Sequence, residues 1–568
     1  MIDLTIRICG AAGQGIATIS STISRILTKW GYYAVISSSV ESRIRGGISF
    51  FTIRFSDEKL ESLRSDIDIL VALSQDALDH NIPFLSTKGI VLFDPNDLNF
   101  DSEAALPVNF SMILKDNNLP KYVVNTLAVG VVFGQLTNEK DALKVLIQKL
   151  FEKKSPEANW DAFRLGYEIG REKHKYFKDI ALKDMGNPKM LISGNDAIGF
   201  GSLCAGLAFY CGYPMTPSTG ILSYLLKQGQ KIPLGVIQAE SEVAAINMAC
   251  GAAFTGARTM VGTSGGGFCL MCEGLSWAAM SETPLVMVCV TRPGPSTGMP
   301  TRTEQSDLAF LLNAGHGEFL RFVFAPGDPE QAFYLMERAF NLADKYQVPV
   351  LILSDKYLGM SEFTLDELNP EFSIERPMKP TEYQLTNGYK RYLVTDSGIS
   401  PLLFPGETED LVHVSGDEHD EQTWYAEAAE TRITMTNKRF AKENAMEQEI
   451  RDPDIYGEGD ADYLFITWGS TLGPAKEAIH LLRKEGIAAS MVHFVDLWPF
   501  PRGRFRELVQ KYGNECKLIG IEGNVTGLFS NLVQEQTCIE IPHRILKYDG
   551  REFTADYIVK RFKEEVFQ

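Results

Sequence analysis

The first part of the chain alternates between strand-like and helix-like hydrophobic patterns. Apolar and polar residues alternate in LTIRIC, the glycine-rich turn GAAGQG follows, and apolar residues then recur at helical spacing from Ile16 to Trp30. This order predicts a β-α-β unit with a glycine-rich crossover turn, which further strands extend into a doubly wound sheet. The strand patterns lie at 4–9, 33–37, 67–73 and 89–93.

The rest of the chain repeats the alternation twice, with one long interruption. Residues 138–184 have the charged, amphipathic pattern of a helical connector, and a second α/β pattern begins at Met190. Five prolines and the acidic run GDEHDEQ interrupt it, and a third α/β pattern begins at Tyr463. The predicted divisions are a first domain with its connector, a second domain, an irregular excursion and a third domain, at 1–185, 186–365, 366–457 and 458–568.

The glycine-rich turn at 10–15 allows two interpretations. Backbone amides at a helix start could hold the pyrophosphate of a dinucleotide. The glycines, however, run G-x-x-G-x-G instead of G-x-G-x-x-G, and the second strand pattern ends in Ser37, Ser38 and Ser39 with no acidic residue for a ribose. The spacing favours a Rossmann-like domain with another ligand or a contact role over a nicotinamide site.

Composition excludes several classes of partner. A formal net charge of -18 would repel a phosphate backbone, so we expect no nucleic-acid binding. No export signal and no apolar run of membrane-spanning length is visible, and we expect a cytoplasmic protein. Nine cysteines are too sparse for a disulfide framework, and Cys269 and Cys272 are expected to pack in the core. The chain has no four-cysteine run for a 4Fe-4S cluster, and we predict no metal ligands of its own.

The segment QAESEVAAINMACGAAFTGAR, residues 238–258, combines acidic residues with an alanine-rich helix pattern. Glu240, Ser241 and Glu242 all suit a helix amino terminus, so simple capping is one interpretation. The sequence TSGGG follows at 263–267 and could wrap a planar ring or a carboxylate. The glycine-rich sequence that follows this helix pattern favours a functional acid at the start of the helix.

Several motifs together resemble the alpha subunit of the 2-oxoacid:ferredoxin oxidoreductases. They are YPMTPST, SEVAAINMACGAAFTGAR, GTSGGGF, SETPLV and RPGPSTGMPTRTEQSDL, all within residues 213–308. GAAGQG with RIRGG resembles the gamma domain of that family, and TWGSTLGPAKEA, DLWPFP and IEGNVTG resemble its transketolase-C-terminal-like domain. The departures are Ala11 and Ala12 in the first turn and GGG for the commoner GPG at 265–267.

The resemblance implies a multidomain α/β fold and a set of site residues. The domains are a Rossmann-like gamma domain, a pyrimidine-type domain that binds thiamine diphosphate, and the transketolase-C-terminal-like domain. Glu242, favoured over Glu240, would share a proton with N1' of the cofactor. Thr216 would stabilise the developing oxyanion, and Arg302 would bind the substrate carboxylate. The remaining cofactor contacts implied are Tyr213, Pro214, Thr263, Ser264 and Gly265, and Arg43 and Arg45 are weaker candidates for coenzyme A.

These assignments have simpler structural alternatives, and the proposed function has rivals. Thr216 could belong to a plain proline-rich turn, and Arg302 could be a surface arginine in a polar loop. A nicotinamide-dependent dehydrogenase that uses GAAGQG, or a non-catalytic scaffold, are the rival functions. Glu242, Thr216 and Arg302 together argue against the scaffold.

The absence of a GDG motif from the sequence implies a partner. By the resemblance, a beta subunit carries the GDG motif for the diphosphate and Mg²⁺ and also the 4Fe-4S cluster, so the active site lies at a heterodimer interface, with (alpha-beta)2 expected. Coenzyme A and ferredoxin are the implied cosubstrates. The fused gamma-alpha arrangement resembles enzymes acting on 2-oxoglutarate, so we expect that substrate first and pyruvate second.

Overall fold

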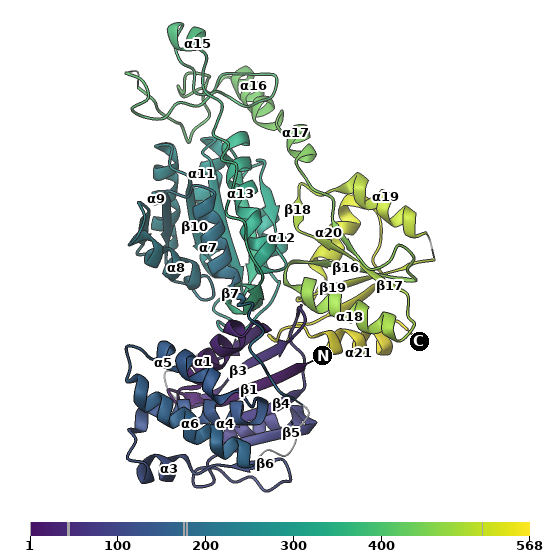
Figure 1. Cartoon of the computed structure of the whole chain (residues 1–568). Helices are drawn as coiled ribbons and strands as arrows, with labels where there is room; N and C mark the ends of the chain where they lie inside the picture. The colour runs from purple at the N-terminus through teal and green to yellow at the C-terminus, as the bar shows by residue number, and fades with distance from the viewer. Residues whose placement is uncertain are drawn as a thin grey trace. The chain divides into compact units, whose positions relative to one another are not determined.

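The structure is a computed structural model that describes residues 2–41, 46–173, 177, 180–409, 411–513 and 515–567. The chain forms two compact units (Figure 1). The first comprises Met1–Ile192, Ser361–Leu368 and Thr554–Asp556, and the second comprises Ser193–Met360, Asn369–Phe553 and Tyr557–Gln568. No helix within the described ranges is both long and apolar enough to cross a membrane.

An eight-stranded sheet organises the first unit, in the order β6-β5-β4-β1-β3-β2-β14-β7. Its strands are β1 (Asp3–Ala12), β2 (Tyr33–Ser39), β3 (Gly46–Ser56), β4 (Ile67–Ala72), β5 (Leu85–Phe93), β6 (Ala105–Pro107), β7 (Met190–Ser193) and β14 (Glu362–Leu365). The helices are α1 (Ile16–Lys29), α2 (Gln75–Asn81), α3 (Phe110–Asp116), α4 (Val124–Leu136), α5 (Lys140–Leu150) and α6 (Pro156–Glu172). The four predicted strands and the helical character of 138–184 are confirmed.

The predicted β-α-β unit is wrong in one respect. Strand β3, which the sequence patterns did not reveal, pairs antiparallel with both β1 and β2 and separates them. Its second half is buried on both faces, with Thr52 and Arg54 on one and Ile53 and Phe55 on the other. Arg54 is neutralised by an ion pair of 2.8 Å with Asp3 on β1. The strand is therefore held by a partner 51 residues away, which no local pattern indicates.

A seven-stranded sheet forms the first layer of the second unit, in the order β18-β12-β13-β11-β10-β8-β9. All neighbouring strands from β12 to β9 are parallel, and β18 is antiparallel to β12. The strands are β8 (Phe209–Gly212), β9 (Gly235–Gln238), β10 (Thr259–Thr263), β11 (Leu285–Thr291), β12 (Phe322–Phe324), β13 (Pro349–Asp355) and β18 (Asp496–Trp498). The helices are α7 (Gly194–Cys204), α8 (Thr219–Gly229), α9 (Glu242–Phe254), α10 (Gly265–Leu270), α11 (Cys272–Met280), α12 (Leu308–Asn313), α13 (Pro329–Tyr346) and α14 (Lys356–Met360).

A second sheet in this unit has five strands, in the order β15-β17-β16-β19-β20. They are β15 (Asp454–Tyr456), β16 (Tyr463–Trp468), β17 (Ala489–Phe494), β19 (Lys517–Glu522) and β20 (His543–Leu546), with helices α18 (Leu472–Lys484), α19 (Arg502–Tyr512), α20 (Leu528–Thr537) and α21 (Ala555–Glu565). One hydrophobic core joins both sheets, because Val323 and Leu351 of the first belong to the same cluster as Trp468 and Phe494 of the second.

The described residues of the excursion predicted at 366–457 form three helices, α15 (Glu382–Thr386), α16 (Ala429–Phe440) and α17 (Glu443–Gln448), and strand β15 near its end, and otherwise largely lack regular structure. A buried ion cluster anchors α16. Glu282 lies between α11 and β11, and its two carboxylate oxygens are each 2.5 Å from an ammonium group, that of Lys438 and that of Lys442. The segment is therefore fixed to the amino ends of the parallel strands.

The prediction that Cys269 and Cys272 pack in the core is wrong for Cys269, which is exposed. Cys272 is partly buried and packs against the core that contains Phe268 and Met271. Phe268 and Met271 themselves have 1% and 0% of their surface exposed.

Candidate active site

The carboxyl ends of four parallel strands bring most of the predicted site residues to one edge of the seven-stranded sheet. Strand β8 leads into Tyr213 and Pro214, β9 into Glu242 at the start of α9, and β10 ends at Thr263. Strand β11 leads into the segment 292–307. Carboxyl ends of parallel strands form the usual ligand-binding edge of an open α/β sheet.

Glu242 is a buried acid with an unpartnered oxygen. Only 3% of its surface is exposed, and no described hydrogen-bond donor reaches its Oε1 atom. The capping role belongs to its neighbour, because the Ser241 hydroxyl accepts a hydrogen bond of 3.2 Å from the Ala244 amide. Glu240 is exposed, so only Glu242 combines burial with a free acceptor. A buried acceptor without a donor is costly, which indicates that a ligand completes it.

The glycine-rich segment after β10 closes against this carboxylate. A Cβ atom on Gly267 would overlap with Glu242 Oε1 and with Thr263 Oγ1, so only glycine fits there. The Ser264 hydroxyl, one residue after Thr263, is also buried without a hydrogen-bond partner among the described residues. Two unsatisfied polar groups therefore share the edge with a backbone that packs closely against the Glu242 carboxylate.

The YPMTPST turn reaches the same cluster. Met215 Sδ lies 3.9 Å from Thr263 Oγ1, which joins the turn to the end of β10. The Thr216 carbonyl accepts a hydrogen bond of 2.6 Å from Arg292 Nη1. Asn195 donates to the Pro217 carbonyl at 2.9 Å, while its own Oδ1 is buried and unpartnered. Tyr213 is 40% exposed and available for contact at this edge.

Two acids at this edge escaped the sequence reasoning. The Asp307 carboxylate lies against Gly265, where a Cβ atom would overlap with Asp307 Oδ2. Burial raises the pKa of Asp307 to about 6, and burial together with Asp307 raises the pKa of Glu304 to about 7. Such shifts are typical of functional sites. The signal was present in TEQSDL, where two acids precede an apolar helix start, but only the folded loop places Asp307 beside Gly265.

Arg302 occupies a different part of the segment 292–307. A Cβ atom on Gly550 would lie 3.1 Å from Arg302 Cβ, and Arg302 contributes to lowering the pKa of Lys356, whose main cause is burial. Close to it, Gln305 donates to the Trp468 carbonyl at 3.0 Å and accepts from the Gly523 amide at 2.8 Å. The structure therefore groups Arg302 with the loops of the five-stranded sheet, and its carboxylate-binding role stays a prediction.

The glycine-rich turn of the first unit offers little to a dinucleotide. Gly15, the residue before α1, packs so closely on the Asn125 side chain that a Cβ atom would overlap with it. The adjacent cavity, of about 220 Å³, carries Asp94 and Asp97, whose charge disfavours a pyrophosphate. Arg43 and Arg45, the candidates for coenzyme A, lie outside the described residues.

Three family profiles match the chain in succession. Residues 5–169 match pyruvate ferredoxin/flavodoxin oxidoreductase, residues 201–438 match the thiamine-diphosphate-binding domain of pyruvate flavodoxin/ferredoxin oxidoreductase, and residues 461–558 match core domain II of pyruvate:ferredoxin oxidoreductase. The second of these contains the edge described above.

Individual proteins agree with the profiles. The chain is 32% identical to a 2-oxoacid:ferredoxin oxidoreductase subunit alpha of Saccharolobus solfataricus, over 98% of this chain and 97% of that protein. It is 32% identical to the 2-oxoglutarate synthase subunit KorA of Methanocaldococcus jannaschii, over 56% of this chain and 86% of that protein.

One solved structure covers nearly the whole chain. It is the 2-oxoglutarate:ferredoxin oxidoreductase from Magnetococcus marinus with 2-oxoglutarate, coenzyme A and succinyl-CoA bound, at 31% identity, with a TM-score of 0.91 and 99% of both chains covered. The predicted multidomain α/β class and the presence of a thiamine-diphosphate-binding domain are confirmed. The chain therefore belongs to the 2-oxoacid:ferredoxin oxidoreductases, as the alpha subunit of such an enzyme.

Proposed function

We propose that this alpha subunit, together with a beta subunit, oxidatively decarboxylates 2-oxoglutarate with coenzyme A and ferredoxin, or runs the reverse carboxylation of succinyl-CoA. The observation that carries the catalytic role is the buried, unpartnered carboxylate oxygen of Glu242. The choice of 2-oxoglutarate is supported by the printed names of the methanogen relative and of the Magnetococcus marinus structure. Pyruvate or a broad range of 2-oxoacids is the second candidate, supported by the family profiles.

The residues at the carboxyl edge fit thiamine diphosphate. Glu242 offers a free acceptor, Ser264 offers a free hydroxyl, and Gly267 has no side chain that would displace the Glu242 carboxylate. When bound, the cofactor supplies the nucleophilic carbon that attacks the keto group of a 2-oxoacid. Glu242 would hold a proton at N1' of the aminopyrimidine, and its burial excludes water from that proton.

The other polar residues of the edge have positioning roles in this proposal. Thr216 and Ser264 would donate hydrogen bonds to the charge that develops on the substrate oxygen. Arg302, in the segment 292–307, would bind the substrate carboxylate. Because burial raises the pKa of Glu304 to about 7 and that of Asp307 to about 6, the two acids can exchange protons with a bound ligand close to neutral pH.

Helix α9 provides the contact surface proposed for the beta subunit. Val243, the residue after the buried Glu242, and Met248, further along this helix, are 46% and 42% exposed. A Cβ atom on Gly251 would meet nothing within 4 Å in this chain, so the glycine serves no packing need here and would permit close approach of a partner. In this proposal the partner supplies the ligands of the diphosphate, Mg²⁺ and the 4Fe-4S cluster.

Two measurements test the proposal. The chain purified alone is expected to bind neither thiamine diphosphate tightly nor iron, whereas the chain co-expressed with the beta subunit binds both; stoichiometric iron in the lone chain would contradict the two-subunit proposal. For the substrate, kcat/KM of the reconstituted enzyme is expected to favour 2-oxoglutarate over pyruvate. Equal or reversed values would replace 2-oxoglutarate by the second candidate.

A further inference from the structure

The second unit has another cavity at the opposite edge of the seven-stranded sheet. Its volume is about 360 Å³, which is in the range of small-molecule sites. Helix α11 forms one wall and ends at Met280, just before β11 begins at Leu285, so the cavity lies at the amino ends of the strands. Glu242 and Ser264 lie at the carboxyl ends, and the cavity therefore belongs to no part of the active site described above.

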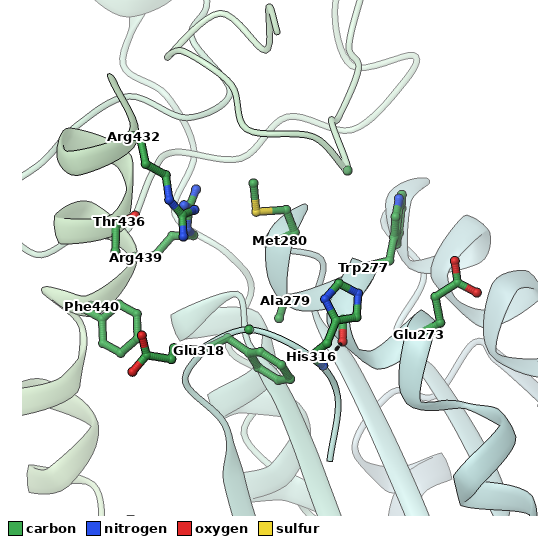
Figure 2. A pocket seen from close by; sticks show the side chains of 14 residues that line it. Glu273, Trp277, Ala279, Met280, His316, Glu318, Arg432, Thr436, Arg439 and Phe440 are labelled. Carbon is green, nitrogen blue, oxygen red and sulfur yellow. Dashed lines mark hydrogen bonds between the residues drawn. The ribbon is translucent and has the colours of Figure 1, made fainter. Parts of the chain in front are cut away.

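One face of α16 forms the second wall. Arg432, Thr436 and Arg439 follow one another at helical spacing and all line the cavity. Figure 2 shows them on one side together with Phe440 and Glu318, while Trp277 and His316 lie on the other side. Met280 lies between the two sides. The cavity therefore has a polar end and an apolar end.

The polar end contains groups of both charges with unused hydrogen-bonding capacity. The Thr436 hydroxyl is buried and has no partner among the described residues. Arg432 is 60% exposed and uses only Nη1 for Glu418, while Arg439 holds the same carboxylate at 2.9 Å through Nη2. No ion pair is recorded for Glu318 within the described parts of the chain, so its carboxylate is available.

The charged side chains around the cavity indicate the class of ligand. The guanidinium groups of Arg432 and Arg439 share the single carboxylate of Glu418, which leaves one positive charge at this end of the cavity, and the Glu318 carboxylate lies on the same side. One remaining positive charge beside a carboxylate disfavours a polyanion such as a nucleotide. A purely cationic ligand would leave the Thr436 hydroxyl and the free Arg432 nitrogens unused. A zwitterion satisfies both sets of groups.

We propose that this cavity binds an α-amino acid with an apolar or aromatic side chain. Its carboxylate contacts the Arg432 guanidinium and the Thr436 hydroxyl, its ammonium group contacts Glu318, and its side chain lies over Met280 toward Trp277 and His316. The inference is independent of the substrate proposed for the enzyme, because none of these residues belongs to the carboxyl edge.

Binding to the full-length chain in its complex tests the proposal by calorimetric titration with three probes. L-phenylalanine has both charges, 3-phenylpropionate has only the carboxylate, and 2-phenylethylamine has only the ammonium group. Saturable binding of L-phenylalanine is expected, with each truncated probe at least about tenfold weaker, because each lacks one charge-assisted hydrogen bond. Absence of saturable L-phenylalanine binding, or equal binding of either truncated probe, overturns the proposal.

Substitutions of residues that line the cavity test which group of the ligand each residue contacts. Glu318→Gln is expected to weaken L-phenylalanine about tenfold and to leave 3-phenylpropionate unchanged, whereas Thr436→Val weakens both. Glu273→Gln is the matched control, because Glu273 lies beyond Trp277 from the arginines in Figure 2. An equal loss with Glu273→Gln overturns the assignment of the ammonium site. If a variant fails to fold, the comparison of probes on the unmodified chain still decides.

Discussion

Two buried carboxylates, one at each edge of the seven-stranded sheet, differ in their partners. At the carboxyl edge, Glu242 Oε1 is buried without a hydrogen-bond partner among the described residues, as are Ser264 Oγ and Asn195 Oδ1. At the amino edge, Glu282 is equally buried, but Lys438 and Lys442 each place an ammonium group 2.5 Å from its carboxylate. The carboxylate of Glu282 therefore finds its partners within the chain, and that of Glu242 does not.

This difference separates structure from function in physical terms. A buried charge with partners contributes to a defined fold, whereas a buried polar group without partners costs stability and calls for an explanation, of which a ligand is one. Burial alone does not identify an active site. Glu242 combines burial and a missing partner with a place at the carboxyl edge, and the predictions below compare it with the paired carboxylate of Glu282.

The largest effect on stability is expected at the amino edge. Glu282→Gln leaves two buried ammonium groups without their counter-ion, which is expected to reduce the free energy of unfolding by about 3–5 kcal/mol. Burial would raise the pKa of Glu282, but Lys438 and Lys442 outweigh it and hold that pKa well below its usual value. Because the folded-state pKa is lowered, this stabilisation is complete above about pH 4.3 and declines as the pH falls below it.

Denaturant unfolding at several pH values measures this effect. The difference between the unmodified chain and Glu282→Gln is expected to narrow below about pH 4.3. Glu507→Gln, a change at an exposed position of α19, is the control and is expected to stay within about 0.5 kcal/mol. A difference of similar size for both variants, independent of pH, would show that the ion cluster does not stabilise the fold.

A second change tests the substrate end of the carboxyl edge. Arg302→Ala is expected to raise KM for the 2-oxoacid by an amount equivalent to about 1.5–3 kcal/mol, because a charge-assisted contact to the carboxylate is lost. KM for thiamine diphosphate is expected to stay unchanged. Arg502→Ala, at an exposed position of α19, is the control with no expected effect on either constant. An unchanged KM for the 2-oxoacid in Arg302→Ala would place the carboxylate site elsewhere.

A third change tests the space beside Glu242. Gly267→Ala places a methyl group against Glu242 Oε1 and Thr263 Oγ1, and overpacking of this kind costs about 1–3 kcal/mol. We expect weaker binding of thiamine diphosphate to the complex, measured by activity against cofactor concentration. Gly266→Ala is the matched control, since its nearest atoms would lie 3.7 Å away, an ordinary contact. Equal effects of the two variants would mean that the close packing of Gly267 on Glu242 does not matter for cofactor binding.

The smallest effects compare one hydroxyl at each edge. Ser281 Oγ lies 2.8 Å from Thr283 Oγ1 at the amino edge, so Ser281→Ala leaves a buried group unpaired and is expected to cost about 1–3 kcal/mol. Ser264→Ala removes a hydroxyl that has no partner, and its stability is expected to change by less than about 1 kcal/mol. Thermal unfolding measures both. A larger loss for Ser264→Ala would reverse the comparison.

The sequence predicted individual strands better than the contacts between residues far apart in the chain. Strands such as 4–9 and 67–73 follow from local alternation and are confirmed by β1 and β4. Strand β3 escaped because its buried Arg54 depends on Asp3, a partner that only the folded chain brings close. The ion cluster of Glu282 escaped for the same reason, since Lys438 and Lys442 are 156 and 160 residues away.

The candidate site shows the same division. The motifs identified Glu242, Thr263 and Ser264, because each of these residues ends or closely follows a parallel strand and therefore lies at the carboxyl edge. Asp307 was missed because only the returning loop places it against Gly265. The role of Glu242 was chosen over that of Glu240 from motif alignment, and the burial of one and the exposure of the other now support the same choice.

The most direct test of the account is exchange of the thiazolium C2 proton of thiamine diphosphate in the complex with its beta subunit. Glu242→Gln preserves shape but cannot hold the ionised form, and exchange is expected to slow by about 10²–10⁴, while the fold and the complex persist. Glu240→Gln, at an exposed position two residues earlier, is expected to have little effect. Exchange that slows only in Glu240→Gln, or in neither variant, would contradict the assignment of Glu242 as the acid that activates the cofactor.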